Sequence, residues 1–300
     1  MRVPLGMIGL GIMGSAMSAN LIRARYRVVG YDVLAARLRE HRRAGGLVAR
    51  GCDEVGREAG IIVCSLPSSE ALRQTADDLV EITRAPRIVI ETSTLPMAAK
   101  EDARRRLAGR GITLLDCPLS GTGSQARAKD IVVYASGERR ACRTAAPIFD
   151  AIARAHYYVG AFGAGSKMKF VANLLVAVHN VAAAEAMVLA MKAGLDPAMT
   201  VKVIGDGAGS SRMFQVRAPM MVKGDYSRAL MKLDVWQKDM TIIGDFARET
   251  DCPTPLFATT ASIYTAALAR GRGADDTGAV CAVLEQMAGL TRQFKVQRSK

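Results

Sequence analysis

The sequence has few of the residues that metal sites, disulfide frameworks and nucleic-acid surfaces require. It contains only three histidines, and none of its six cysteines has the Cys-x-x-Cys spacing of a zinc site. We therefore expect no bound metal, and reduced thiols that pack as small hydrophobic side chains. Aromatic residues account for only 5% of the chain, which leaves few rings to stack on bases, so nucleic-acid binding is not expected.

The start of the chain also lacks the features of an export or membrane segment. Its opening residues are apolar, but they form a short stretch broken by glycines, and no small-residue cleavage pattern follows a charged region. We expect a cytoplasmic protein with no membrane partner. The 300 residues are 50% hydrophobic, which is ample for a packed core, and the formal charge of +13 predicts a surface that attracts anions such as nucleotides or carboxylates.

The N-terminal residues contain the glycine pattern of a dinucleotide-binding turn. Residues 3–8 are typical of a short buried strand, the sequence GLGIMG follows at 9–14, and residues 15–25 are typical of a helix. In this context the glycines permit a tight turn, a close approach of a pyrophosphate and close packing of the helix on the strand. The residues predicted to contact the cofactor here are Gly9, Leu10, Gly11, Ile12, Met13 and Gly14.

An acidic residue at the end of the second predicted strand indicates which dinucleotide binds. Asp32 directly follows the strand at 27–31. A carboxylate there accepts hydrogen bonds from the adenosine ribose hydroxyls and repels a 2′-phosphate, so Asp32 favours NAD. Arg37 and Arg39 nearby keep NADP as the less favoured alternative. Asp32 could also cap the helix that follows it, and the two roles are compatible.

Strand and helix patterns continue to alternate to about residue 160, which predicts a parallel, doubly wound sheet of the Rossmann type. In such sheets the ligand lies beyond the carboxyl ends of the strands, which places Leu66, Pro67 and Thr94 beside the cofactor. A loop of small residues after the strand at 112–116 exposes consecutive backbone N–H groups, so it is a candidate clamp for a carboxylate. An ordinary glycine-rich turn is the alternative. The clamp residues are Ser120, Gly121, Thr122 and Gly123.

A long helix is predicted at about 165–193, because the surrounding stretch contains no proline and almost no charge. On such a helix Lys169 and Asn173 lie within about 40° of each other, whereas Lys167 lies about 160° from Lys169. We therefore expect Lys167 to be solvated and Lys169 to point into a site. The alternative is that Lys169 merely lays its stem along apolar surface.

The rest of the sequence is helical in pattern, with no strand alternation of any length. The predicted fold class is therefore α/β, with a Rossmann-type NAD-binding domain at 1–162 and an all-α domain for substrate binding and oligomerisation at 163–300. The long helix joins the two. Within the second domain, Lys238 and Asp239 have the pattern of a surface charge pair.

Taken together, these motifs resemble those of the β-hydroxyacid dehydrogenases, the family of 3-hydroxyisobutyrate dehydrogenase and tartronate semialdehyde reductase. The resemblance covers nearly the whole chain and implies a C-terminal domain like that of 6-phosphogluconate dehydrogenase. Its marks are GLGIMG at 9–14, SLP at 65–67, TST at 92–94, DCPLSG at 116–121, GAGSKMKFVAN at 163–173, KD at 238–239 and GRGADD at 271–276.

The resemblance implies an NAD(P)-dependent oxidoreductase that transfers hydride between nicotinamide and a small 3-hydroxy acid or the corresponding semialdehyde or oxo acid. Lys169 matches the family's catalytic lysine, a general acid and base, and Asn173 matches the asparagine that holds the substrate. Ser120 and Gly121 match the carboxylate-binding loop, and Lys238 matches a lysine near the nicotinamide. Members are usually dimers or tetramers built through the helical domain, so a homodimer or homotetramer is expected.

The chain departs from the family pattern in the substrate loop. Thr122 occupies a position usually held by glycine, and so do Gln125 and Lys129. We expect a more polar pocket of a different shape, and a substrate other than hydroxyisobutyrate. Hydroxyisobutyrate itself, glycerate or tartronate semialdehyde, a four-carbon sugar acid such as threonate, and a sulfonated analogue all fit a small anion beside Lys169.

Two alternatives of the same fold remain at the level of sequence. One is an imine reductase-like enzyme, although imine reductases usually lack the lysine at position 169. The other is a non-catalytic regulatory module that binds NAD(P). The second alternative would bind nucleotide without turning over any acid.

Overall fold

The computed structural model describes residues 4–82 and 87–291. The chain forms two compact units, Met1–Phe170 and Val171–Lys300, which we call the sheet unit and the helical unit. The division between them falls inside the long helix, whereas the sequence-based division places that helix wholly in the second domain.

One mixed sheet organises the sheet unit. Its first, parallel part has the strand order β3-β2-β1-β4-β5-β6, which is the order of a Rossmann fold. β8 then pairs antiparallel with β6 and β7, and β9 pairs parallel with β8. The strands are β1 (Leu5–Ile8), β2 (Val28–Tyr31), β3 (Leu47–Val48), β4 (Ile61–Cys64), β5 (Ile88–Glu91), β6 (Thr113–Asp116), β7 (Leu119–Ser120), β8 (Val132–Ser136) and β9 (Ala155–Gly160). The doubly wound sheet expected from the sequence is confirmed.

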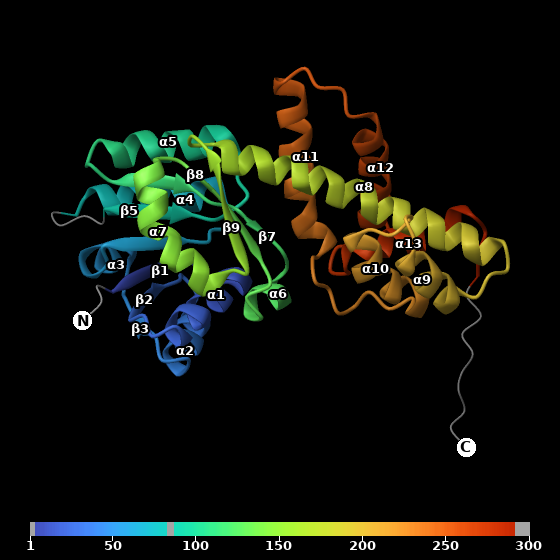
Figure 1. Ribbon diagram of the computed structural model, residues 1–300, viewed down its shortest axis with the longest axis horizontal. Helices are drawn as coiled ribbons and strands as arrows, with labels where there is room; N and C mark the ends of the chain where they lie inside the picture. The colour runs from blue at the N-terminus through green and yellow to red at the C-terminus, as the bar shows by residue number, and fades with distance from the viewer. Residues whose placement is uncertain (1–3, 83–86, 292–300) are drawn as a thin grey trace. The chain divides into compact units, whose positions relative to one another are not determined.

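Helices cover both faces of this sheet (Figure 1). They are α1 (Ile12–Arg23), α2 (Ala35–Arg43), α3 (Cys52–Glu58), α4 (Ser69–Val80), α5 (Met97–Ala108), α6 (Gly123–Arg127) and α7 (Arg139–Ile152). One apolar core, which includes Met17 and Phe149, lies under α1 and α7, and a second, which includes Leu72 and Leu107, lies under α3, α4 and α5. Apolar residues on both sides of the strands are what a sheet covered on both faces requires.

The helical unit contains no strand within its described residues, so the all-α prediction is confirmed. The long helix is α8 (Ala164–Lys192), within one residue of its predicted ends at 165 and 193. By length and composition α8 could cross a membrane, but core helices of proteins outside membranes meet the same criteria. The elements after it are α9 (Pro197–Asp206), α10 (Arg212–Lys223), α11 (Leu233–Glu249), α12 (Pro255–Ala269), the 3-10 turn η1 (Thr277–Ala279) and α13 (Val280–Met287).

Candidate active site

The three glycines between β1 and α1 serve three different purposes. Gly9 has φ +86°, and a Cβ placed on it would lie 2.1 Å from the carbonyl oxygen of Ser65. A Cβ on Gly14 would lie 1.9 Å from the carbonyl oxygen of Gly9, so this glycine lets α1 pack against the turn. A Cβ on Gly11 would meet nothing within 4 Å. The space beside Gly11 is therefore open to a ligand, as a pyrophosphate site requires.

The first turn of α1 is suited to an anion. Gly11 is its N-cap and supplies no side-chain hydrogen bond, so the helix N-terminus keeps its donors and its positive dipole end. Ile12 is 66% exposed and Met13 is half-buried. Leu10 is fully buried, so within the predicted set of cofactor contacts it can contribute only its backbone.

Asp32 is held at the end of β2 by two backbone amides. One carboxylate oxygen accepts from the N–H of Leu10 at 2.7 Å, and the other accepts from the N–H of Leu34 at 2.8 Å. The second bond tightens the turn before α2, and the first ties Asp32 to the glycine turn. The interpretation of Asp32 as the helix cap is wrong, because the N-cap of α2 is Leu34 and no side chain caps this helix. Arg37 pairs with Glu40 on α2, at 2.9 Å. Asp32 therefore lies next to the turn that is open to a dinucleotide.

The ends of β4 and β5 meet at the same edge of the sheet as the glycine turn. Leu66 follows β4, and its N–H donates to the hydroxyl of Ser93, which follows β5, at 2.8 Å. Thr92 donates to the carbonyl oxygen of Cys64 at 2.7 Å, which joins the two strand ends a second time. Pro67 is exposed and Thr94 is half-buried. The predicted positions thus lie at the edge where a dinucleotide binds in a fold of this kind.

The predicted substrate loop lies against the start of α1. A Cβ on Gly123 would lie 2.2 Å from the side chain of Ile12, so loop and turn are in close contact. Ser120 ends β7 and is half-buried, and Gly121 has φ +138°, a conformation that favours glycine. The loop and the cofactor turn therefore belong to one region of the sheet unit.

Thr122 and Gln125 use their polar groups within the loop. Thr122 is the N-cap of α6, and its N–H donates to the side-chain oxygen of Gln125 at 2.9 Å, which forms a capping box. The Gln125 amide also donates to Asp130 at 3.2 Å. The predicted run of outward-facing amides is therefore interrupted at Thr122, and Gln125 shapes the loop instead of adding polarity to a pocket. Lys129, at the other position usually held by glycine, has φ +60°.

The two lysines at the start of α8 differ in environment as predicted. Lys167 is exposed, whereas Lys169 is half-buried. Lys169 lies in the second turn of the helix, three residues after the fully buried Ser166. The helix itself, which contains no proline, fixes the spacing from Lys169 to Asn173 at one turn.

Asn173 and Lys238 meet on a residue whose role the sequence did not reveal. In the helical unit the amide of Asn173 donates to Asp239 at 2.8 Å, and Lys238 pairs with the same carboxylate at 3.1 Å. The expectation that Asp239 belongs to a surface charge pair is wrong, because Asp239 is only 7% exposed. Its spacing from Trp236 and Ile243 on α11 puts it on the buried face, and that spacing could have been recognised.

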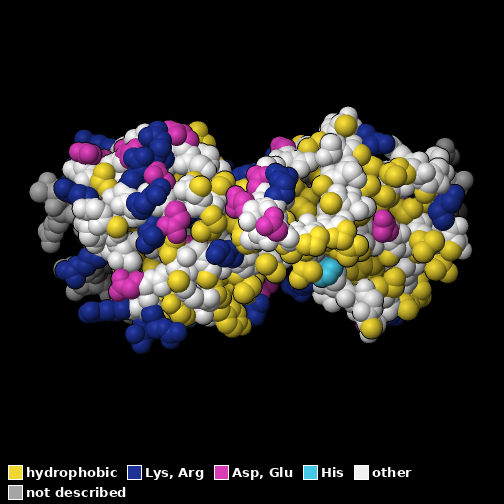
Figure 2. All heavy atoms as spheres, turned by 90° about the horizontal axis from the view of Figure 1, so that it is seen from above, with side chains coloured by type: hydrophobic (Ala, Val, Ile, Leu, Met, Phe, Trp, Pro, Cys, Tyr) yellow, Lys and Arg dark blue, Asp and Glu magenta, His cyan; other side chains and the backbone are white. Residues whose placement is uncertain are grey.

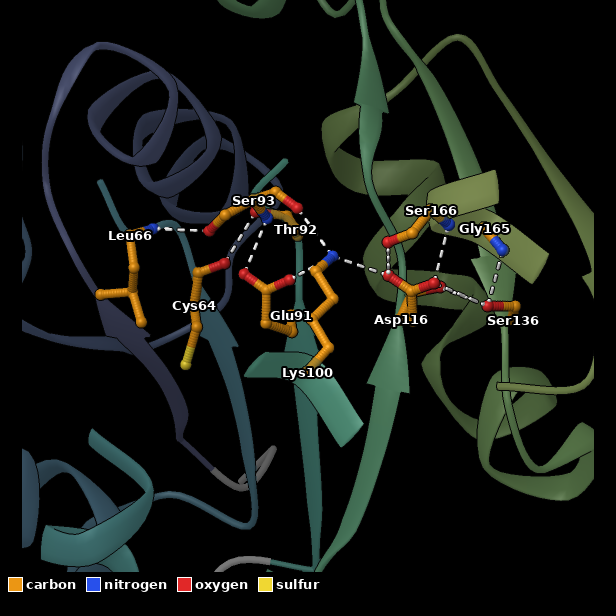
Figure 3. A network of polar contacts seen from close by, with 10 residues as sticks. All are labelled: Cys64, Leu66, Glu91, Thr92, Ser93, Lys100, Asp116, Ser136, Gly165 and Ser166. Atoms are coloured by element: carbon orange, nitrogen blue, oxygen red, sulfur yellow. Dashed lines mark hydrogen bonds and ion pairs between the residues drawn. The ribbon is translucent and has the colours of Figure 1, made fainter. Parts of the chain in front are cut away.

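A second buried ionic group, at the ends of β5 and β6, was also missed. Lys100 on α5 pairs with Glu91 at 2.6 Å and with Asp116 at 2.7 Å, and all three side chains are fully buried (Figure 3). Burial disfavours the charged amine, but the two carboxylates outweigh it, so the pKa of Lys100 is raised above its ordinary value. This group lies directly below the loops that carry the predicted cofactor contacts.

The comparisons with known proteins agree with this geometry. Residues 4–160 match the family described as the NAD binding domain of 6-phosphogluconate dehydrogenase. Residues 163–284 match the family described as NAD-binding of NADP-dependent 3-hydroxyisobutyrate dehydrogenase. The chain belongs to the β-hydroxyacid dehydrogenase family. It is an NAD(P)-dependent hydroxyacid dehydrogenase, since the relatives of this family that it matches along most of its length are dehydrogenases and reductases.

Among the relatives of this β-hydroxyacid dehydrogenase is an L-threonate dehydrogenase of Cupriavidus necator. It is 35% identical over 280 residues, which cover 92% of this chain and 94% of the relative. The structure of the 3-hydroxyisobutyrate dehydrogenase of Mycobacterium tuberculosis with L-serine is 28% identical and superposes with a TM-score of 0.86, covering 95% of this chain and 99% of that one. An imine reductase from Pseudomonas sp. shares only the fold, at 18% identity and a TM-score of 0.60, with 95% and 100% of the two chains covered.

The residues of this β-hydroxyacid dehydrogenase fit a nicotinamide dinucleotide. The open space at Gly11, the uncapped start of α1 and the fixed carboxylate of Asp32 suit a pyrophosphate and a ribose. Among the described residues, no group of three or more His, Cys, Asp and Glu side chains could hold a metal ion.

Proposed function

We propose that this enzyme oxidises a small hydroxy acid with NAD, and that Lys169 is the general base that takes the hydroxyl proton. The observation that carries the proposal is the position of Lys169. It is half-buried in the second turn of α8, one turn before Asn173, while its neighbour Lys167 is exposed. An exposed lysine is a poor candidate for a base, since water surrounds its amine.

The proposed chemistry needs little more than one amine and a set of groups that orient the acid. When bound, the nicotinamide accepts hydride from the carbinol carbon. As that hydride leaves, the substrate hydroxyl must lose its proton, and Lys169 accepts it; in the reverse direction Lys169 returns it. Asn173 orients the substrate, and Ser120 and Gly121 hold its carboxylate. Thr122 is assigned a smaller role in binding the carboxylate, because its N–H already donates to Gln125.

For the substrate we propose a four-carbon sugar acid, with L-threonate as the first candidate. The support is the 35% identity to an L-threonate dehydrogenase over nearly the full length of both chains. The hydroxyls of such an acid need polar partners, and the half-buried Ser120 and Lys169 offer a hydroxyl and an amine. L-Threonate has hydroxyls on its second and third carbons, so identifying the product also tests the assignment to a 3-hydroxy acid.

For the cofactor we propose NAD in preference to NADP. The carboxylate of Asp32 would lie beside the ribose hydroxyls and would repel a 2′-phosphate. Arg37, the nearest candidate for binding such a phosphate, already pairs with Glu40.

The deciding experiment measures initial rates of NADH formation on a panel of C3 to C5 2- and 3-hydroxy acids that includes L-threonate. Wild type is compared with Lys169→Ala and, as a matched control, Lys167→Ala. We expect one acid to be turned over clearly best. Lys169→Ala should lower kcat by roughly 10²- to 10⁴-fold, because general acid–base catalysis typically contributes that much. Lys167→Ala should leave kcat unchanged.

The assignment of Lys169 is wrong if Lys169→Ala keeps turnover within about tenfold of wild type. If no acid is oxidised although NAD binds, the imine reductase-like enzyme or the regulatory module replaces the dehydrogenase.

The cofactor preference has its own test. Asp32→Asn should lower the ratio of kcat/KM with NAD to kcat/KM with NADP by at least about tenfold, since a hydrogen bond to a charged group is lost and a repulsion is relieved. The amide keeps one acceptor for the backbone bonds that hold the turn. An unchanged ratio would place cofactor selection elsewhere.

For the assembly we propose a homo-oligomer that uses the helical unit. Large apolar side chains lie exposed on it, including Leu189 at 71%, Leu256 at 69% and Met287 at 66%. Figure 2 shows hydrophobic side chains over much of the visible face of this unit, whereas Lys and Arg side chains gather on the visible face of the sheet unit. Contiguous exposed apolar surface of this kind marks interaction sites. Light scattering should give a dimer or tetramer mass, and a monomer at micromolar concentration would refute this.

For the location we propose the cytoplasm. None of the six cysteines forms a disulfide, and five of them are buried. Cysteines that stay outside disulfides are typical of a reducing compartment.

A further inference from the structure

The ionic group at the ends of β5 and β6 places three acceptors around its lysine. The Lys100 amine donates to Asp116 and to the backbone carbonyl oxygen of Ser93, both at 2.7 Å, and forms an ion pair with Glu91 at 2.6 Å. The same Ser93 accepts from the N–H of Leu66 and donates its own N–H to Glu91 at 2.8 Å. Lys100 is therefore bound to the loop that follows β5 as well as to β6 (Figure 3).

Asp116 extends this group to the start of α8. One carboxylate oxygen accepts from Lys100 and from the hydroxyl of Ser166 at 2.8 Å, and the other accepts from the N–H of Ser166 at 2.7 Å. Ser136 donates to the carbonyl oxygen of Asp116 at 2.8 Å and accepts from the N–H of Gly165 at 2.9 Å. The first turn of α8 thus receives its hydrogen-bond acceptors from β6 and β8. Helices usually satisfy these N–H groups with a nearby side chain or with water.

The backbone of α8 also approaches the sheet closely at this point. A Cβ on Gly165 would lie 2.5 Å from the carbonyl oxygen of Tyr134 and 2.6 Å from that of Asp116. Neither carbonyl can move without disturbing the sheet. The position of the helix start is therefore specified by contact as well as by hydrogen bonds, which leaves it little freedom to shift.

Stability alone is a weak reason for burying these three charges. Taking charged groups out of water costs several kcal/mol each, and apolar side chains of similar volume often serve equally well. What an apolar replacement cannot do is hold two amides of α8 in one register. Ser166 stands three residues before Lys169, so the two side chains lie on the same side of the helix, one turn apart.

We propose that Lys100 and Asp116 are positioning residues, which set the place of Lys169 against the nucleotide-binding edge of the sheet unit. Lys100 holds the Asp116 carboxylate, and Asp116 holds Ser166 in the first turn of the helix that carries Lys169. This inference rests on the proposed role of Lys169 as the general base. It assigns no contact with substrate to Lys100 or Asp116.

The test is a double-mutant cycle on kcat, with L-threonate and NAD, or with the acid of the panel that has the highest kcat/KM. Ser166→Ala removes one hydrogen bond to Asp116 and should lower kcat by up to about tenfold. Asp116→Asn disturbs both bonds to Ser166 and should lower kcat by about 10²-fold, the cost of misplacing a reacting group by about 1 Å. In a Lys169→Ala background neither substitution should lower the residual rate further, because they act through Lys169.

Two matched controls separate positioning from general damage. Ser211→Ala removes the N-cap serine of α10, and Asp102→Asn removes an exposed carboxylate of α5. Both should leave kcat unchanged in either background. Circular dichroism melting checks that each variant is folded, and Ser166→Ala carries the test if Asp116→Asn does not fold.

The proposal is overturned if Ser166→Ala and Asp116→Asn lower kcat by the same factor with and without Lys169. It is equally overturned if folded Ser166→Ala and Asp116→Asn both keep the wild-type kcat. If Lys169 is not the general base, the single variant Lys169→Ala keeps its turnover. That result is distinct from a failure of the positioning proposal, which is read from Ser166→Ala and Asp116→Asn.

Discussion

Both units of this enzyme bury groups of opposite charges, and the Lys100 group and the Arg217 group differ in what they join. In the sheet unit Lys100 is shared by two carboxylates at the strand ends, next to loops and to the start of α8. In the helical unit Arg217 pairs with Asp276 at 2.7 Å, and both are at least 96% buried. Asp276 also accepts from the N–H groups of Leu230 and Gly278, at 2.7 and 2.9 Å.

The two groups therefore have different tasks. The Arg217 group joins three elements of the packed interior: α10, η1 and the segment that precedes α11. One guanidinium nitrogen of Arg217 has no hydrogen-bond partner among the described residues. In the Lys100 group one Glu91 oxygen likewise has no hydrogen-bond partner beyond its ion pair within the described part of the chain, but this group contacts the loop that follows β5 and the first turn of α8, one turn before Lys169. We therefore expect buried charge to stabilise structure in the helical unit and, through Lys169, to orient chemistry in the sheet unit.

The largest effect is expected from breaking the group in the helical unit. Arg217→Leu leaves Asp276 buried without its cation, which should lower the free energy of unfolding by about 3–5 kcal/mol. At temperatures where the protein stays folded, kcat should be that of wild type. Urea unfolding and initial rates measure the two quantities. A clear fall in kcat of the folded variant would remove the distinction between the groups.

A smaller effect on stability is expected at the helix start. Gly165→Ala puts a methyl group against two sheet carbonyls, and such overpacking costs about 1–3 kcal/mol. Because α8 must shift, kcat should fall by about 10²-fold. Gly205→Ala in α9 is the control, since its Cβ would meet nothing within 4 Å and alanine favours a helix by about 0.5–1 kcal/mol. Equal kcat values in the two variants would contradict a tightly specified helix start.

The smallest expected effect is on the pH dependence of stability, which should differ between the Lys100 group and the Arg217 group. The folded-state pKa of Lys100 is raised, although burial opposes its charge, because Glu91 and Asp116 favour it. The stabilisation from Lys100 is therefore complete below the pKa of an unfolded lysine, about 10.4, and is lost as pH rises through the folded value. Arginine keeps its charge throughout this range. The urea midpoint of wild type and of Arg217→Leu should fall above about pH 10.4, and that of Lys100→Met should fall less. If the urea midpoint falls equally with pH in all three proteins, the charge of Lys100 does not contribute to the pH dependence of stability.

Most of the fold could be predicted from the sequence because its signals are local. Gly9, Gly11 and Gly14 mark the first turn, and the absence of proline in 164–192 specifies a helix whose ends were predicted within one residue. Alternating strands and helices then leave little choice of topology. The contrast between Lys167 and Lys169 followed from helical geometry alone.

The buried ionic groups could not be predicted in the same way, because their partners are distant in sequence. Lys100 belongs to a charged helix of outer-face composition, and only its spacing from Ala103 and Leu107 indicates the buried face. Which carboxylates meet it depends on the pairing of β5 with β6. The capping box differs, because the spacing of Thr122 and Gln125 is itself a sequence signature that could have been recognised.

That capping box closes the entry to α6, but the rest of the segment is tied to its neighbours. Thr122 and Gln125 bond to each other within the loop, whereas the fully buried Ala126 accepts from Asn20 of α1 at 2.7 Å and Asp130 pairs with Arg154 at 3.0 Å. Enzyme design that alters which acid is accepted at this loop therefore has to keep these two anchors to the scaffold.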